Sequence, residues 1–269
     1  MTAVDERPPL VAQVADPLGL SADERQPART SRLGYLLTPL VLAGVCAALY
    51  VFVSGRELDS IEARILTRDV ITSRAWEHVW LTVVSTLLVI ALAVPVGILL
   101  TRRFSQAITP ALIGVANIGQ AVPSIAVLVL LALTFALLGF RSAVIALVAY
   151  SFLPVLRNTM VGLQQVDRSV IDAARGMGMT KLGVLGRIEL PLAVPVIFAG
   201  VRTALVINVG TATLATYVNA GGLGDIISAG LAQNRTIITV VGSTLTAVFA
   251  LFIDYVGGIA EDVLRPRGL

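Results

Sequence analysis

The chain has 269 residues, of which 56% are hydrophobic and 14% charged, with a mean hydropathy of +0.87. A soluble domain carries about 25% charged residues, so the composition excludes a water-soluble protein and indicates several membrane spans. The net charge of +3 comes from loop arginines without a basic, aromatic-laced patch, so no nucleic-acid partner is expected.

The first 54 residues contain a polar segment and one apolar segment. Residues 1–32 are rich in Pro, Ala and charged residues without apolar periodicity, which predicts a disordered cytosolic tail. Residues 33–54 are apolar and long enough to cross ~30 Å of hydrocarbon, so they predict the first span. The single cysteine, Cys46, lies in this span and has no partner for an internal disulfide.

An external linker is predicted after the first span. Together, the first span and this linker make up residues 33–77. Leu58, Ile61 and Ile65 recur at helical spacing among residues of both charge signs, which predicts a short amphipathic helix on the membrane surface. The lone histidine, His78, lies between two tryptophans. It is interpreted as a residue of the membrane–water interface rather than a metal ligand, and no metal site is predicted.

The rest of the chain predicts five further spans. Four are straight apolar runs, at residues 79–100, 142–156, about 190–217 and 237–257. The apolar run 108–139 is too long for one straight span and is interrupted by polar and helix-breaking residues, namely Gly119, Gln120, Pro123 and Ser124. An interrupted helix inside the bundle is expected, because non-helical backbone at that depth must be covered by protein or water. A glycine turn at 221–225 and a short helix to Ala232 precede the last span.

Basic residues give the expected orientation. They gather on one side of the predicted spans, at Arg102, Arg103, Arg157, Arg168, Arg175, Lys181, Arg187, Arg265 and Arg267. Positive loops favour the cytoplasm, so both termini and the loop 159–189 are expected there. The sequence shows no internal repeat, which weighs against a secondary transporter built from inverted repeats.

The loop 159–189 is polar and rich in small residues. Ala174 and Gly178 lie four positions apart on one helix face, so another surface could approach closely there. Such a segment is typical of a helix that lies in a groove of a partner. Leu190-Pro191 then restarts an apolar run, with Pro191 suited to the first turn of a new helix.

The spacing in this loop resembles the EAA loop of ABC importer permeases. Asp172-Ala173-Ala174 is followed by Gly178 and then by Ile188-x-Leu190-Pro191. In that family the loop forms the coupling helices that fit into cytosolic ATPase subunits. The resemblance therefore implies a coupling loop at 164–189, with coupling residues Asp172, Ala173, Ala174, Gly178, Ile188, Leu190 and Pro191. Asp172 stands where the family usually has Glu.

Residues 78–262 also resemble the osmoprotectant branch of these permeases, for glycine betaine, choline, carnitine or proline. Gln120-Ala121-Val122-Pro123-Ser124, Leu156-Arg157-Asn158-Thr159 and Gly221-Gly222-Leu223-Gly224-Asp225 carry this resemblance. It implies an all-α polytopic membrane bundle with about six transmembrane helices and a MetI-like permease core. A cytosolic tail at 263–269 would follow. A permease for methionine or another small zwitterion remains an alternative, as does a stand-alone secondary transporter, which would need acids inside the spans.

Several polar residues in the spans are candidates for the translocation path, namely Gln120, Pro123, Ser124, Arg202, Asn208 and Thr211. Arg202 is either functional or a structural anchor to a carboxylate such as Asp254, because an unpaired arginine in a membrane is costly. The broken helix around Pro123 either lines the path or is a packing kink. Asn208 and Thr211 either face the path or make hydrogen bonds between helices.

No phosphate-binding loop and no catalytic constellation is present in the sequence. The chain is therefore not expected to be an enzyme or to hold a cofactor, and ATP and Mg are expected on a partner ATPase. The resemblance implies further partners: a pair of ATPase subunits, a second permease subunit (identical or paralogous), an external substrate-binding protein and the lipid bilayer. The expected location is the bacterial plasma (inner) membrane.

Overall fold

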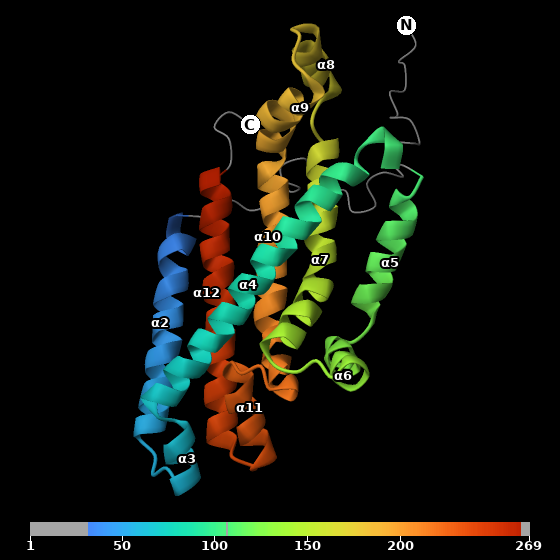
Figure 1. Cartoon of the computed structure of the whole chain (residues 1–269). Helices are drawn as coiled ribbons and strands as arrows, with labels where there is room; N and C mark the ends of the chain where they lie inside the picture. The colour runs from blue at the N-terminus through green and yellow to red at the C-terminus, as the bar shows by residue number, and fades with distance from the viewer. Residues whose placement is uncertain (1–31, 106, 265–269) are drawn as a thin grey trace, which may run out of the picture. The chain divides into compact units, whose positions relative to one another are not determined.

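The computed structural model describes residues 32–105 and 107–264 (Figure 1). The predicted tails 1–32 and 263–269 lie almost entirely outside this range, together with Arg265 and Arg267. By its contacts the chain divides into one unit that ends at Val41 and a second that begins at Leu42. The second unit contains almost all of the described structure and every site discussed below.

The described residues form helices and contain no strand, which confirms the all-α prediction. The longer helices are α2 (Arg32–Ser54), α4 (Arg68–Leu100), α5 (Thr109–Ala121), α6 (Ser124–Phe135), α7 (Phe140–Gln164), α10 (Leu190–Ala212), α11 (Leu223–Ala232) and α12 (Thr236–Leu264). Shorter helices are α3 (Ser60–Ile65), α8 (Arg168–Gly176), α9 (Lys181–Val184), 3-10 turns at Arg103–Ser105 and Thr213–Val218, and a π-helical turn at Leu185–Glu189. Among the described residues, five helices are long and apolar enough to span a membrane, and α5 with α6 could form a sixth.

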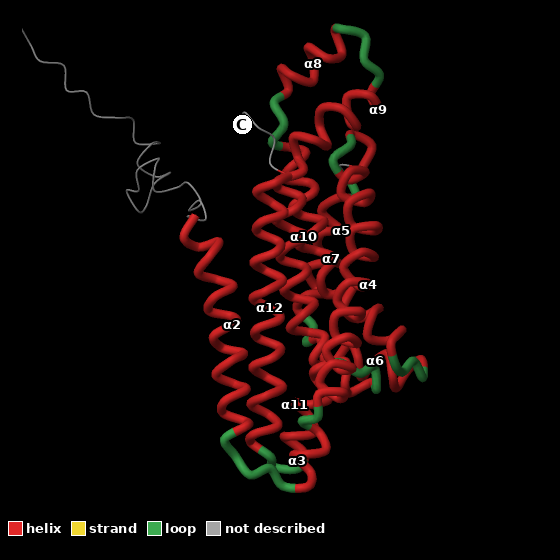
Figure 2. The backbone as a smooth tube through the Cα atoms, turned by 90° about the vertical axis from the view of Figure 1, so that its left-hand side faces the viewer, coloured by secondary structure: helices red, strands yellow, loops and turns green. Residues whose placement is uncertain are grey.

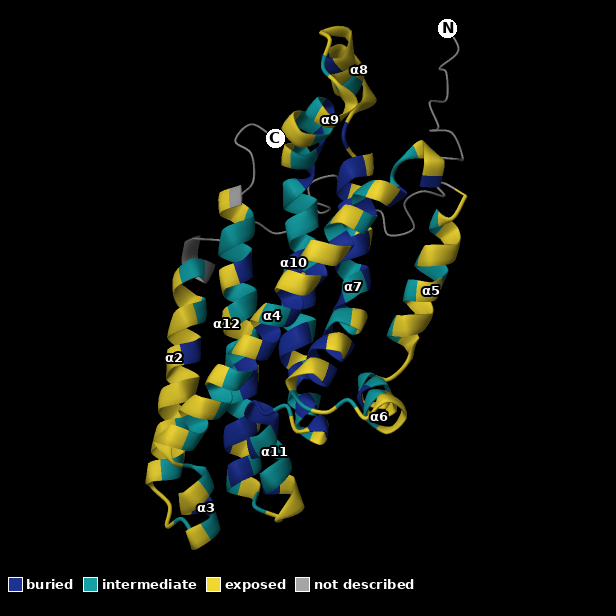
Figure 3. Ribbon diagram, viewed as in Figure 1, coloured by how far each residue is buried: buried dark blue, intermediate teal, exposed yellow. Residues whose placement is uncertain are grey.

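Helices α4, α7 and α10 form the centre of the core, and Figure 3 shows buried segments in dark blue on these helices and also on α11 and α12. Their backbones approach closely at small residues: a Cβ on Gly200 of α10 would lie 2.6 Å from the Cβ of Asn158 on α7. A Cβ on Gly97 of α4 would lie 2.8 Å from the Cβ of Thr159. Because apolar burial gives no advantage between helices in lipid, such close packing of small residues is a main source of their association.

The interruption expected in the run 108–139 is confirmed. Helices α5 and α6 meet at an angle of 92° across Val122 and Pro123. Pro123 disfavours a helical conformation for Val122, whose backbone is extended (ψ 129°), and this ends α5. Both helices are largely exposed, with Leu128 of α6 as their one buried described residue. After the bend, α6 packs against α7 and the 3-10 turn Thr213–Val218.

The linker before α4 differs from the sequence expectation. Helix α4 begins at Arg68 rather than near residue 79, and the hydroxyl of Thr67 caps it. The short helix expected in the linker is present as α3, and its Ile61 and Ile65 pack against the cluster Leu223, Ile226 and Ile238. Its apolar face therefore covers α11 and α12 within the protein.

Candidate coupling loop and translocation site

The loop between α7 and α10 projects beyond the bundle at one end, where Figure 2 shows α8 and α9, while α3 and α11 lie at the other end. Asp167 caps α8, because its carboxylate accepts a hydrogen bond of 2.8 Å from the N–H of Ser169. That hydrogen bond holds the pKa of Asp167 below its usual value of 3.8. The start of α8 is thus fixed by its own cap.

The tip of the loop is held by hydrogen bonds within the loop. The N–H of Gly178 donates to the carbonyl of Arg175 (3.0 Å), and the N–H of Met179 donates to that of Ala174 (3.1 Å). The guanidinium of Arg175 donates to the carbonyl of Met179 (2.6 Å). Gly178 has a φ of +87°, a left-handed conformation that explains why a glycine stands six positions after Asp172. The tip is therefore preformed in the single chain.

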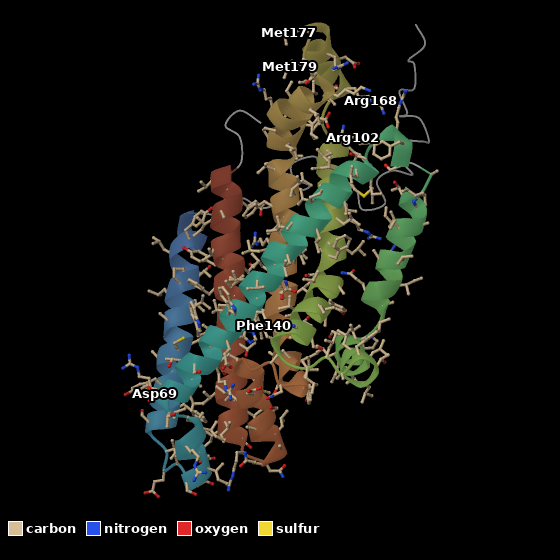
Figure 4. All side chains as sticks on the ribbon, viewed as in Figure 1. Asp69, Arg102, Phe140, Arg168, Met177 and Met179 are labelled. Atoms are coloured by element: carbon tan, nitrogen blue, oxygen red, sulfur yellow. The ribbon has the colours of Figure 1, made fainter. Side chains whose placement is uncertain are left out.

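The residues matched to the EAA pattern point in different directions. Asp172 and Ala173 are exposed, whereas Ala174 is only 1% exposed and packs within this chain. The most exposed large hydrophobic side chains of the loop are Met177 (77%) and Leu182 (79%). Figure 4 shows Met177 at the far end of the loop. An apolar surface for a partner is thus offered by the tip and α9 rather than by Ala174.

The second half of the loop is a continuous extension of α10. Helix α9 runs through the π turn Leu185–Glu189 directly into α10, so no break separates Glu189 from Leu190. The N–H of Leu190 donates to the carbonyl of Leu185, five residues earlier. Pro191 has no N–H for an α-helical bond, and the widened π turn accommodates it. Helix α10 thus begins at Leu190 with Pro191 in its first turn, as expected, but it continues from the π turn without a break in the chain.

The loop is joined to α4 by an ion pair that the sequence analysis did not anticipate. Nη2 of Arg102 lies 2.6 Å from Oε2 of Glu189, and its Nη1 lies 3.4 Å from Oε1. Both groups border a cavity of about 630 Å³ whose other charged side chains include Asp172, Arg175 and Lys181. The sequence does contain a hint of this pair, namely the acidic Glu189 between Ile188 and Leu190. A carboxylate at the end of a membrane span is stable there only with a cationic partner or water.

Arg202 forms an ion-pair cluster with α12. Its Nε and Nη2 donate to the two carboxylate oxygens of Asp254 at 2.7 and 2.8 Å, and its Nη1 donates to Glu261 at 3.4 Å. These groups are half-buried and border a cavity of about 390 Å³ between α10 and α12. The structure therefore supplies the carboxylate anchor, and it also leaves the cluster open to a cavity.

The other path candidates lie on different faces of the bundle. Asn208 is fully buried, and its Nδ2 donates to Oγ1 of Thr86 on α4 (2.9 Å), which is a hydrogen bond between helices. Gln120 donates to the carbonyl of Tyr150 on α7 (2.8 Å). Pro123 is exposed, and Ser124 and Thr211 are half-buried. The cavity next to Arg202 is lined by α10 and α12 residues, so these candidates do not converge on it.

At the opposite end of the bundle, α4 binds the glycine turn before α11. The carboxylate of Glu77 accepts a hydrogen bond from the N–H of Gly222 (3.0 Å), and Nδ1 of His78 accepts one from the N–H of Leu223 (3.3 Å). Arg74 pairs with Glu77 (2.8 Å) and with Asp225 (3.0 Å). His78 is fully buried, so its interpretation as an interfacial residue was wrong.

The helical bundle, its bent pair α5 and α6, and the loop that projects beyond one end define a polytopic membrane protein. Residues 93–267 match the family described as binding-protein-dependent transport system inner membrane component. The chain belongs to this family of ABC transporter permeases.

Known relatives of the chain are bacterial permeases. It is 39% identical over 198 residues to the choline transport system permease protein OpuBB of Bacillus subtilis, and the matched region covers 73% of this chain and 89% of the relative. It is also 39% identical over 196 residues to the carnitine transport permease protein OpuCB of Listeria monocytogenes (73% and 88%). The osmoprotectant import permease protein OsmY of Salmonella typhimurium is 36% identical over 222 residues (82% and 90%).

A solved structure shares the fold. An inward-facing structure of the MetNI methionine ABC transporter has a chain that matches with a TM-score of 0.64 and 23% identity, covering 72% of this chain and 96% of that one. At this identity the match confirms the permease fold and carries no information on the substrate.

Proposed function

We propose that the chain is the membrane-spanning subunit of an ATP-driven importer for osmoprotectants that carry a quaternary ammonium group, such as choline, carnitine and glycine betaine. The observation that carries this proposal is the similarity to choline, carnitine and osmoprotectant permeases over about three quarters of the chain. The glycine turn and the broken helix, through which the sequence resembles that branch, are both ordered parts of the fold.

The proposed complex contains a pair of cytosolic ATPase subunits, a second permease subunit and an external binding protein. The preformed tip and the exposed Met177 and Leu182 support docking of an ATPase on the loop, because a rigid apolar projection loses little conformational entropy on binding. In this arrangement the loop and both termini are cytoplasmic. ATP and Mg would be held by the ATPase subunits. Alternating access would follow from rigid-body movement of the spans.

The translocation path is proposed to pass the cluster of Arg202, Asp254 and Glu261. One cation and two carboxylates leave this cluster with a formal charge of −1, which would attract a cationic group that enters the adjacent cavity. Charged side chains on a membrane span also require water or protein around them. An aromatic cage for the ammonium group is assigned to the binding protein rather than to this chain.

A competition experiment tests the substrate class. Uptake of labelled choline would be measured in cells whose own osmoprotectant uptake systems are deleted and that express this chain with its ATPase and binding protein. Excess unlabelled carnitine, glycine betaine, proline and methionine would be added singly. Competition by the quaternary ammonium compounds, and none by methionine, is expected. Uptake of methionine without uptake of any quaternary ammonium compound would contradict the proposed substrate class.

A further inference from the structure

The coupling loop is attached to three core helices in two different ways. Helix α7 enters the loop and α10 leaves it, so a displacement of the loop reaches both helices through the backbone. Helix α4 lies far from the loop in sequence. Besides packing against α7 and α10, it is joined to the loop by the side chain of Arg102, two residues after the end of α4, which binds Glu189 through two nitrogen–oxygen contacts. Paired contacts of this kind fix orientation as well as distance.

The environment of Glu189 favours a permanent connection. Its side chain is only 9% exposed, whereas that of Arg102 is 33% exposed. A carboxylate so little hydrated is strongly destabilised when its partner is removed, so the pair should remain closed in the resting state. Glu189 also ends the π-helical turn, at the position where the loop becomes α10. The pair thus joins α4 to the point where loop and span meet.

Helix α4 then leads to the opposite end of the bundle. It has 33 residues, which corresponds to about 50 Å at a rise of 1.5 Å per residue. Glu77 and His78, near its start, bind the backbone N–H groups of Gly222 and Leu223. One helix therefore holds the coupling loop at one end and the glycine turn at the other. Its path through the core is visible in Figure 1.

We propose that Arg102 and Glu189 are positioning residues that fasten α4 to the coupling loop, so that α4 transmits movement of the loop to the glycine turn at residues 221–225. This inference rests on the proposed function, because it needs an ATPase that moves the loop. Pro95 removes one backbone hydrogen bond from α4, but the helix continues through it. Close packing of Gly97 on Thr159 supports α4 along α7 just beyond that point.

The test uses the complete complex, with ATPase and binding protein, in proteoliposomes. ATP hydrolysis and substrate uptake are measured in the same vesicles, and the amount of assembled complex is measured by copurification. Glu189→Gln keeps the size of the side chain and removes its charge. It should leave assembly intact and lower the uptake per ATP hydrolysed by about 5- to 150-fold, the usual range of coupling between sites. The charge exchange Arg102→Glu with Glu189→Arg should restore part of this loss.

A matched control and a direct readout separate transmission from simple stabilisation. Arg103→Ala removes the neighbouring exposed arginine, for which no ion pair is present in the described part of the chain, and should leave the uptake per ATP unchanged. A spin label attached through Tyr217→Cys, in a Cys46→Ser background, reports on the end of the bundle that holds the glycine turn, because position 217 is exposed. ATP should change the mobility of this label in the parent protein and not in Glu189→Gln.

The outcomes are distinct. The inference would be overturned if Glu189→Gln takes up as much substrate per ATP as the parent protein. It would also be overturned if ATP changes the mobility of the label in Glu189→Gln as much as in the parent protein. Loss of assembly in Glu189→Gln that the charge exchange does not repair would overturn it as well, because the pair would then act on folding alone. If the parent complex itself shows no ATP-dependent uptake, the proposed function fails first.

Discussion

Nε2 of His78 on α4 lies 3.0 Å from the carbonyl oxygen of Val209 on α10, a residue 131 positions away. The other ring nitrogen accepts the N–H of Leu223, so the proton of the neutral imidazole is on Nε2 and is donated to Val209. The ring also contacts Phe249 of α12 edge-to-face, with centroids 5.7 Å apart. One buried imidazole thus connects α4, α10, α12 and the glycine turn.

Replacement of His78 by alanine should destabilise the protein. The substitution leaves the N–H of Leu223 without its partner and opens a cavity, so a loss of about 2 kcal/mol or more is expected. The measurement is the apparent unfolding temperature in detergent. Trp80→Ala is the control, because Trp80 is 51% exposed, and it should have a much smaller effect. Equal effects of the two substitutions would contradict the central position of His78.

Gly222→Ala should also be destabilising. Gly222 has a φ of +96°, and a Cβ there would lie 3.1 Å from Nδ1 of His78. The conformational strain alone is worth about 1–2 kcal/mol, and the crowding adds to it. Gly114→Ala is the matched control, since a Cβ on Gly114 meets nothing within 4 Å and its φ is not positive. Thermal unfolding should distinguish the two variants, and equal stability of both would contradict the geometry of the turn.

Arg202→Ala should lower transport much more than it lowers the amount of protein in the membrane. The substitution leaves the carboxylates of Asp254 and Glu261 without their cation, at a stability cost of roughly 1–3 kcal/mol, between the values for exposed and buried pairs. Uptake and abundance are measured in parallel. Proportional losses of both would show that Arg202 is a structural anchor only. Arg202→Lys should keep the charge and lose the paired contacts with Asp254.

Gly178→Val should impair coupling while leaving membrane insertion intact. A Cβ on Gly178 would meet nothing within 4 Å in this chain, so the penalty comes from its φ of +87° and from any partner surface. Gly176→Val is the matched control, because its surroundings are equally open and its φ is not positive. The ratio of uptake to ATP hydrolysis should fall in the first variant only. A normal ratio in Gly178→Val would show that the tip tolerates rearrangement.

The cap of α8 should resist acid. Because the pKa of Asp167 is lowered in the folded loop, the stabilisation is complete above the unfolded value of 3.8 and disappears only as the pH falls through the lower folded value. A spin label attached through Val170→Cys, in the Cys46→Ser background, reports on the start of α8. Its mobility should therefore be constant from pH 7 to 4 and rise below that range. Asp167→Asn should abolish this pH dependence, since an amide caps without titrating. A rise in the parent protein near pH 6 would contradict the assignment.

The sequence was sufficient for the number and kind of spans because hydropathy and length decide them. The broken helix at Pro123 was predicted because proline acts on the residue next to it. Gly178 was expected on one helix face with Ala174, but it lies beyond the end of α8 with a φ of +87°, because its left-handed conformation belongs to the turn at the tip. His78 was misplaced, because neighbouring tryptophans do not reveal that its ring is buried and hydrogen-bonded between helices. The Arg102–Glu189 pair was missed, since an ion pair across 87 positions depends on tertiary packing that local spacing does not encode.

ATP dependence of uptake by the purified complex tests the proposed function most directly. The chain is reconstituted with its ATPase and binding protein, and entry of labelled choline or glycine betaine is measured with ATP, without ATP, and with an ATPase that binds but does not hydrolyse ATP. Uptake against a concentration gradient that requires ATP hydrolysis is the predicted result. Equal uptake without ATP, or by the chain in the absence of any ATPase, would contradict the assignment as an importer subunit.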